Sequence, residues 1–142
     1  MKKIGVVLFG AAVFVAGYWS GSGVRSAHAQ TGGRVFELRT YHANEGKLEA
    51  LETRFREHAL ELFKRHNMTS VGYWLPTDDP AKGKTLVYML AFPSRDAAKK
   101  SWAEFFADPD WKKAAHESEL NGKLVSKVDS EFMTPADFSP IK

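Results

Sequence analysis

Residues 84–92, with the sequence KTLVYMLAF, constrain the fold of this chain more than any other segment. Alternate residues of a β-strand point to opposite faces of a sheet. Both faces of this segment are apolar: one carries Leu86, Tyr88, Leu90 and Phe92, and the other carries Val87, Met89 and Ala91. A strand of this kind is buried on both sides, so each face of its sheet must be covered by another layer.

Three further segments have the composition of strands: residues 34–42, 68–75 and 124–133. Residues 76–83 are rich in proline, aspartate and glycine and form the loop of a hairpin between 68–75 and 84–92. We therefore expect four strands, two of them joined directly.

Two helical regions separate these strands. Apolar residues at three- and four-residue steps predict a helix of about 20 residues that follows Asn44 as its N-cap. Asn67 suits the left-handed position after that helix. Ser94 is expected to cap a second helix over 95–107, and Asp108 to cap a continuation that runs to about residue 120.

The order β-α-β-β-α-β predicts an α+β, ferredoxin-like fold, in which an antiparallel four-stranded sheet carries the helices on one face. Two helices leave the second face of the sheet open, although residues 84–92 are apolar there as well. A second copy packed sheet to sheet is the simplest cover, so the sequence predicts a homodimer that forms a dimeric α/β barrel.

The first 29 residues have the features of a cleavable signal peptide. Lys2 and Lys3 precede an uncharged, mostly apolar run over residues 4–19, and Ala27-His28-Ala29 is a small-x-small cleavage site. We expect cleavage after Ala29 and export to the periplasm or the exterior, with no membrane association afterwards. The alternative is an uncleaved membrane anchor, but the apolar run is shorter than the ~20 residues that a membrane-spanning helix needs. A flexible leader (30–33), one domain (34–135) and a C-terminal tail (136–142) would remain.

Charge and cysteine content exclude several functions. Lys2, Lys3 and Arg25 account for the whole formal net charge of +3, so the basic pI of about 9.1 gives no reason to expect a nucleic-acid partner. The chain has no cysteine, which excludes disulfides. It also lacks the H-E-x-x-H, phosphate-loop and G-x-S-x-G motifs, so we predict no metal site and no serine nucleophile.

The strand at 34–42 carries the main candidate site. Glu37, Arg39 and Tyr41 share a face that we assign to the barrel interior, where Tyr88 is expected to join them. Charges in an apolar cavity need partners, either one another or a ligand. The four residues therefore form either a structural ion pair with hydroxyls that stiffen the dimer, or a site that orients a small polar or acidic molecule.

Two histidines are further candidates. His42, at the end of the same strand near the cavity mouth, is either a general base or ligand-binding residue, or a solvated side chain. His58, beside the apolar stripe of the first helix, is either an axial haem ligand or a histidine that packs the helix on the sheet. Haem is the one cofactor we consider, and the sequence contains no accompanying haem motif.

Several motifs resemble those of the NIPSNAP family, a branch of the dimeric α/β-barrel superfamily. They are FELRTY at 36–41, Gly46-Lys47-Leu48, Ala91-Phe92-Pro93-Ser94, the W-x-x-F-x-x-D-P-x-W pattern at 102–111 and Phe132-Met133-Thr134-Pro135. The resemblance extends over about residues 34–140, and it implies the same fold as the order of the elements.

The resemblance implies no single activity, because the NIPSNAP family has no generally agreed one and the wider superfamily includes monooxygenases and isomerases. Our first hypothesis is an exported homodimer that binds a small molecule or interacts with another protein. The alternative is a cofactor-light monooxygenase or isomerase acting on a small aromatic or quinone-like compound. The third hypothesis is haem binding through His58. Whether the chain is an enzyme stays open.

Overall fold

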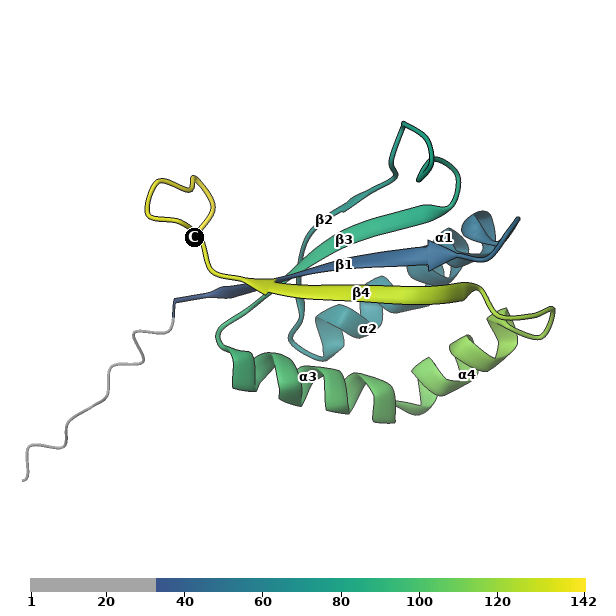
Figure 1. The fold of residues 1–142 in the computed structure, drawn as a ribbon. Helices are drawn as coiled ribbons and strands as arrows, with labels where there is room; N and C mark the ends of the chain where they lie inside the picture. Colours follow the sequence, from purple (N-terminus) through teal and green to yellow (C-terminus); the bar gives the residue numbers. More distant parts are fainter. Residues whose placement is uncertain (1–32) are drawn as a thin grey trace, which may run out of the picture.

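The computed structural model describes residues 33–142, and the predicted signal peptide lies outside this range. Four strands form one antiparallel sheet in the order β2-β3-β1-β4. The elements are β1 (Val35–Ala43), α1 (Leu48–Arg54), η1 (Phe55–Ala59), α2 (Leu60–Arg65), β2 (Thr69–Trp74), β3 (Thr85–Phe92), α3 (Arg95–Ala107), α4 (Pro109–Ser118) and β4 (Val125–Met133). The helices lie on one face of the sheet (Figure 1), which confirms the predicted fold class.

The first helical region differs in detail from the prediction. Its first helical residue is Leu48, with Lys47 as the N-cap, and Asn44 instead belongs to the preceding turn. The side-chain amide of Asn44 donates to the carbonyl oxygen of Lys123 at 2.8 Å, and Gly46 has a φ of +67°. The turn therefore uses the polar side chain that a helix cap would need, and the helix begins three residues later than a cap at Asn44 implies.

This helical region also contains a π-helical turn, η1, between α1 and α2. Such a turn inserts one extra residue into the helix and is frequent at functional sites. Asn67, at a φ of 58°, ends the region in the left-handed conformation that the sequence predicts.

The caps of the second helical region are confirmed. The Ser94 hydroxyl accepts a hydrogen bond from the Ala97 N–H at 3.1 Å. The Asp108 carboxylate accepts from the Asp110 N–H at 2.8 Å, and Pro109 occupies the first position of α4. These local hydrogen bonds hold α3 and α4 at an angle to each other beneath the sheet (Figure 1).

The two faces of β3 have different surroundings. Leu86, Tyr88, Leu90 and Phe92 are buried under the helices. Val87 and Met89 are half-buried on the face that has no helices, where Trp74 of β2 is 50% exposed. The sheet therefore presents an open face that is apolar along β3, as the pattern of residues 84–92 predicts, and charged along β4.

The segment after Met133, which includes the C-terminal tail, lies at one end of this open face (Figure 1). Between the tail and the sheet is a cavity of about 410 Å³, lined on the sheet side by Phe36, Met89 and Met133. Within residues 33–142, no helix is both long and apolar enough to cross a membrane.

Candidate functional site

The carboxylate of Glu37 is the most enclosed charged group among the described residues, with a side chain only 2% exposed. It accepts hydrogen bonds from Arg39 Nη1 at 2.7 Å, Ser130 Oγ at 2.6 Å and Trp102 Nε1 at 2.6 Å. The donors come from β1, β4 and α3, so one side chain joins the sheet to the helix layer. These three hydrogen bonds compensate for the loss of water around the charge.

The position of Glu37 corrects the face assignment made from the sequence. Glu37, Arg39 and Tyr41 point toward the helices, not toward the open face where a second copy would form the barrel interior. Alternation along the strand separates the two faces correctly, but it does not determine which face the helices cover.

Arg39 completes this buried polar centre as a fixed cation. Its guanidinium lies 4.3 Å from the ring centroid of Trp102 and 5.6 Å from that of Tyr41. Burial acts to lower the pKa of Arg39, but the neighbouring Tyr88 and Tyr41 and the hydrogen bond to Glu37 outweigh it and raise the pKa. The Nε atom of Arg39 is buried without a hydrogen-bond partner in the described structure. The predicted ion pair is therefore present, and it is held by protein groups.

Tyr41 and Tyr88 pair with each other beside this centre. The Tyr88 hydroxyl donates to the Tyr41 hydroxyl at 3.2 Å, and burial raises the pKa of Tyr88 well above its usual range. Both phenol rings contact Phe55 edge to face, with centroid distances of 5.7 Å for Tyr41 and 5.1 Å for Tyr88. Tyr88 is thus a neutral hydrogen-bond donor at physiological pH, enclosed by aromatic rings.

An apolar pocket opens on the other side of Phe55, and sequence reasoning missed it. Its volume is about 260 Å³, and it lies between the helical region around η1 and the end of β2. Its lining consists of Phe55, Leu60, Tyr73, Trp74, Leu75 and Leu86, with Glu52 and Arg56 as its charged residues. The π-helical turn that places Phe55 here has no sequence signature, although the aromatic residues of β2 point to burial of some kind.

Tyr73 connects this pocket to the predicted residues. Its ring stacks on Tyr88 at a centroid distance of 5.7 Å and an interplanar angle of 20°. Burial raises the pKa of Tyr73 despite the opposing hydrogen bond with Ser70. Tyr41 and Tyr88 therefore form the layer behind the pocket wall, and Tyr73 is the phenol that lines the pocket itself.

The two candidate histidines lie apart from this site. His42 is on the open face, where its Nε2 is 2.8 Å from Asp129 Oδ2. The pKa of Asp129 is lowered by its hydrogen bonds with Lys127 and then with His42. His58 lines a groove between η1 and α4 on the outside of the helix layer. Among residues 33–142, no three His, Asp or Glu side chains are placed to hold a metal ion.

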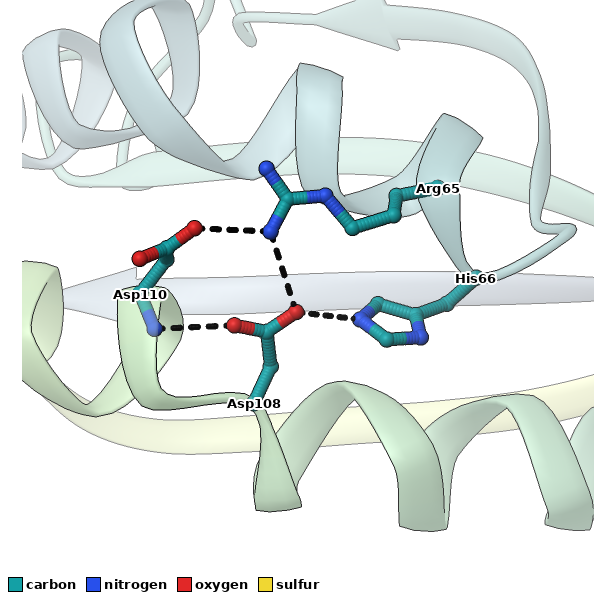
Figure 2. A network of polar contacts seen from close by, with 4 residues as sticks. All are labelled: Arg65, His66, Asp108 and Asp110. Atoms are coloured by element: carbon teal, nitrogen blue, oxygen red, sulfur yellow. Dashed lines mark hydrogen bonds and ion pairs between the residues drawn. The ribbon is translucent and has the colours of Figure 1, made fainter.

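A second polar network joins the two helical regions (Figure 2). Asp108 Oδ2 lies 2.7 Å from His66 Nε2 and 3.3 Å from Arg65 Nη1, and Arg65 also binds Asp110 at 2.7 Å. The hydrogen bond with His66 is the main cause that lowers the pKa of Asp108. The aspartate of the D-P-x-W segment thus caps α4 and ties it to the end of α2.

Arg54 is a buried residue that the sequence did not single out. Its side chain is 5% exposed, and Nη1 donates to Glu119 Oε1 at 3.1 Å. Its guanidinium lies 5.3 Å from the Trp111 ring centroid. The last tryptophan of the motif at 102–111 therefore packs on a cation of the first helical region.

Comparison with known proteins places this geometry among related folds. Residues 36–140 match the family model described as NIPSNAP. No curated protein matches the sequence. The chain is similar to a NIPSNAP family protein of unknown function from Agrobacterium tumefaciens, at 26% identity over 78% of this chain and 95% of that chain, with a TM-score of 0.68.

Two further solved structures share the fold at lower identity. A second NIPSNAP family protein from Agrobacterium tumefaciens is 20% identical over 77% of this chain and 99% of that chain, with a TM-score of 0.67. An uncharacterized NIPSNAP-like domain protein from Burkholderia xenovorans is 17% identical over 75% of this chain and 89% of that chain, with a TM-score of 0.65.

The Glu37 network predicts a large stability effect from a small change. The variant Glu37→Gln keeps the side-chain shape but leaves Arg39 without its buried counter-charge, so we expect the free energy of unfolding to fall by about 3 kcal/mol. Urea unfolding, monitored by circular dichroism, measures this free energy. Glu45→Gln, in the exposed turn before α1, is the matched control. A loss of stability in Glu37→Gln as small as the loss in the control would contradict the structural role of Glu37.

Proposed function

The chain belongs to the NIPSNAP family, and from this premise we propose that it is an exported homodimer that binds a small apolar molecule beside its sheet. The pocket behind Trp74 is the observation that carries the proposal. Its volume of about 260 Å³ suits a compound of one or two rings, and six of its eight lining residues are apolar or aromatic.

The polar groups at the Glu37 centre already have protein partners, which supports the pocket as the binding site. Glu37 already has three donors, and the hydroxyls of Tyr41 and Tyr88 bond to each other. In the pocket, by contrast, Trp74 and Leu75 are about half exposed. A bound apolar molecule would remove this surface from water, which is the usual source of affinity for such a pocket.

Arg56 suggests the chemical character of the ligand. It pairs with Glu52 four residues earlier, but its side chain is 63% exposed at the pocket, so the guanidinium has further N–H donors that can face a ligand. A ligand with an anionic group at one end of an apolar body would place its rings against Phe55 and Tyr73 and its charge near Arg56. We therefore propose a small aromatic acid or a compound of similar shape.

The open face of the sheet supports the homodimer. Val87 and Met89 are half-buried there with no helix above them, and a second sheet would complete their burial. Export is proposed from the charged start, the apolar run and the Ala27-His28-Ala29 site.

The alternative function, a cofactor-light monooxygenase or isomerase, has one residue in its favour. Tyr73 lines the pocket, and its hydroxyl lies 2.6 Å from Ser70 Oγ. A phenol at this position can donate a hydrogen bond to a ligand carbonyl. A test of turnover would use the aromatic acid of the binding experiment and would compare the protein with its Tyr73→Phe variant.

Binding is tested by isothermal titration calorimetry with 2-naphthoate, an aromatic acid with two rings. At about 0.3 kcal/mol per non-hydrogen atom, we expect a dissociation constant of about 1 mM or tighter. Leu60→Glu, which adds a negative charge to the apolar lining, should weaken binding at least tenfold. Leu120→Glu, at an exposed leucine outside the pocket lining, is the control. Equal affinity in all three proteins would exclude the pocket.

Assembly and export are tested together by expressing the full chain in a bacterium with an outer membrane. We expect a periplasmic protein whose intact mass corresponds to a chain beginning at Gln30, and light scattering that gives twice this mass. A cytoplasmic protein that retains residues 1–29 would contradict export, and the mass of a single chain at micromolar concentration would contradict the homodimer.

A further inference from the structure

The cavity of about 410 Å³ beneath the C-terminal segment (residues 134–142) shares no residue with the aromatic pocket. Its floor is the open face of the sheet, where Phe36, Met89 and Met133 come from the neighbouring strands β1, β3 and β4. Its outer wall is the C-terminal segment, through residues such as Phe138 and Ile141. One chain therefore supplies the whole lining, which is mostly apolar.

The outer wall is an ordered turn that leaves apolar side chains in water. The Ser139 N–H donates to the carbonyl oxygen of Ala136 at 3.0 Å, and Ser139 Oγ donates to the carbonyl oxygen of Ile141 at 2.8 Å. Phe138 is 88% exposed and Ile141 is 53% exposed, although both line the cavity. An apolar ligand in the cavity would cover part of this surface, and the turn is already shaped to receive it.

The shape of the floor suits a flexible chain. Met89 and Met133 have unbranched thioether side chains that adapt to ligands of different shape. The floor crosses three neighbouring strands. At a strand spacing of about 4.8 Å it spans about 10 Å, the length of an extended chain of about eight carbons. An unbranched alkyl chain therefore matches the cavity in both length and polarity.

Arg34 provides a cation for the polar end of such a ligand. Its guanidinium lies 5.9 Å from the ring centroid of Phe36, on the floor of the cavity, and within residues 33–142 it forms no salt bridge. Glu131, the acidic residue of β4 on this part of the face, pairs with Leu38. Because Leu38 is four residues from Arg34 along the strand, about 13 Å, the Arg34 side of Phe36 favours an anion.

The charges of the C-terminal segment bind to its own turn. Asp137 Oδ1 accepts a hydrogen bond from the Phe138 N–H at 3.0 Å. Lys142 Nζ donates to the carbonyl oxygens of Ala136 and Asp137 at 2.6 and 2.7 Å. Arg34 is therefore the cation beside the cavity whose donors are available to a ligand.

We propose that this cavity binds a medium-chain fatty acid. The alkyl chain lies between Phe36 and Met89 on the sheet and Phe138 on the C-terminal segment, and the carboxylate pairs with Arg34. The site needs neither the aromatic pocket nor the homodimer, because its lining and its cation belong to one chain.

The methionines of the chain make the site visible in solution. Besides Met1, the sequence contains Met89 and Met133 in the cavity and Met68 in the core, where it is 2% exposed. In ¹³C-methyl methionine spectra, assigned with Met→Leu variants, we expect decanoate to shift the Met89 and Met133 signals and leave Met68 in place. The dissociation constant should be about 2 mM or tighter. Signals of Met89 and Met133 that do not respond overturn the proposal.

A series of chain lengths tests the apolar part of the ligand. Each buried CH₂ group strengthens binding about fourfold, so octanoate should bind about tenfold more tightly than hexanoate. The gain from octanoate to decanoate should be smaller, because the added carbons extend beyond the floor of the cavity. Equal affinity for hexanoate and octanoate would exclude an alkyl-chain site.

Substitutions distinguish this cavity from the aromatic pocket. Ile141→Glu, which adds a negative charge to the exposed wall, should weaken decanoate binding at least tenfold, whereas Leu120→Glu and Leu60→Glu should leave it unchanged. Weaker decanoate binding in Leu60→Glu, with no effect of Ile141→Glu, would assign the fatty acid to the aromatic pocket and overturn this inference. Loss of the dimer mass in Ile141→Glu, with no decanoate binding to the unaltered protein, would assign the wall to a second copy.

The same titrations test the proposed function separately. Decanoate binding that Ile141→Glu removes, in a protein that does not bind 2-naphthoate, supports this site and rejects the aromatic pocket. Binding of 2-naphthoate without binding of decanoate has the opposite meaning.

Arg34 is tested with a charged and an uncharged ligand of equal length. Arg34→Gln should weaken octanoate binding about threefold, as expected for an exposed ion pair, and should leave 1-octanol binding unchanged. Lys127→Gln, at another exposed cation of the open face, is the control. An equal loss for both ligands, or no loss for octanoate, would contradict the contact with the carboxylate.

Discussion

The buried carboxylate of Glu37 is the interaction on which the rest of the structure depends. A charge that is 2% exposed is tolerated only if protein donors replace its water, and here Arg39, Ser130 and Trp102 do so. These donors belong to two strands and a helix, so satisfying the charge also fixes α3 against the sheet. Within the motif at 102–111, Trp102 therefore contributes a hydrogen bond from its indole N–H as well as apolar packing.

The rest of that motif joins the helices to one another. Asp108 caps α4 and binds His66 at the end of α2, and Trp111 packs on Arg54. These contacts and the Glu37 network hold α3 and α4 beneath β1 and β4. The aromatic pocket lies at the opposite edge of the sheet, where the π-helical turn faces β2. The structure thus combines a tightly bonded side with a side that leaves room for a ligand.

Local features of the sequence predicted local features of the structure well. Ser94, Asp108 and Asn67 act as helix ends because each depends on hydrogen bonds or dihedral angles within a few residues. The face of β1 was assigned wrongly, since alternation is a property of one strand whereas coverage depends on where distant helices pack. Arg54 and the pocket were missed for the same reason. The predicted signal peptide lies outside the described residues and stays a prediction.

Glu37 and Trp102 form a closed structural centre, and we propose that ligands enter the pocket beside Trp74 instead. The indole N–H signals of these two tryptophans, assigned with Trp→Phe variants in ¹H–¹⁵N spectra, test this directly during titration with 2-naphthoate. We expect the Trp74 signal to shift and saturate while the signal of Trp102, whose indole N–H is bonded to Glu37, keeps its position. A shift of Trp102 with Trp74 unchanged would contradict it and would place the ligand at the Glu37 centre.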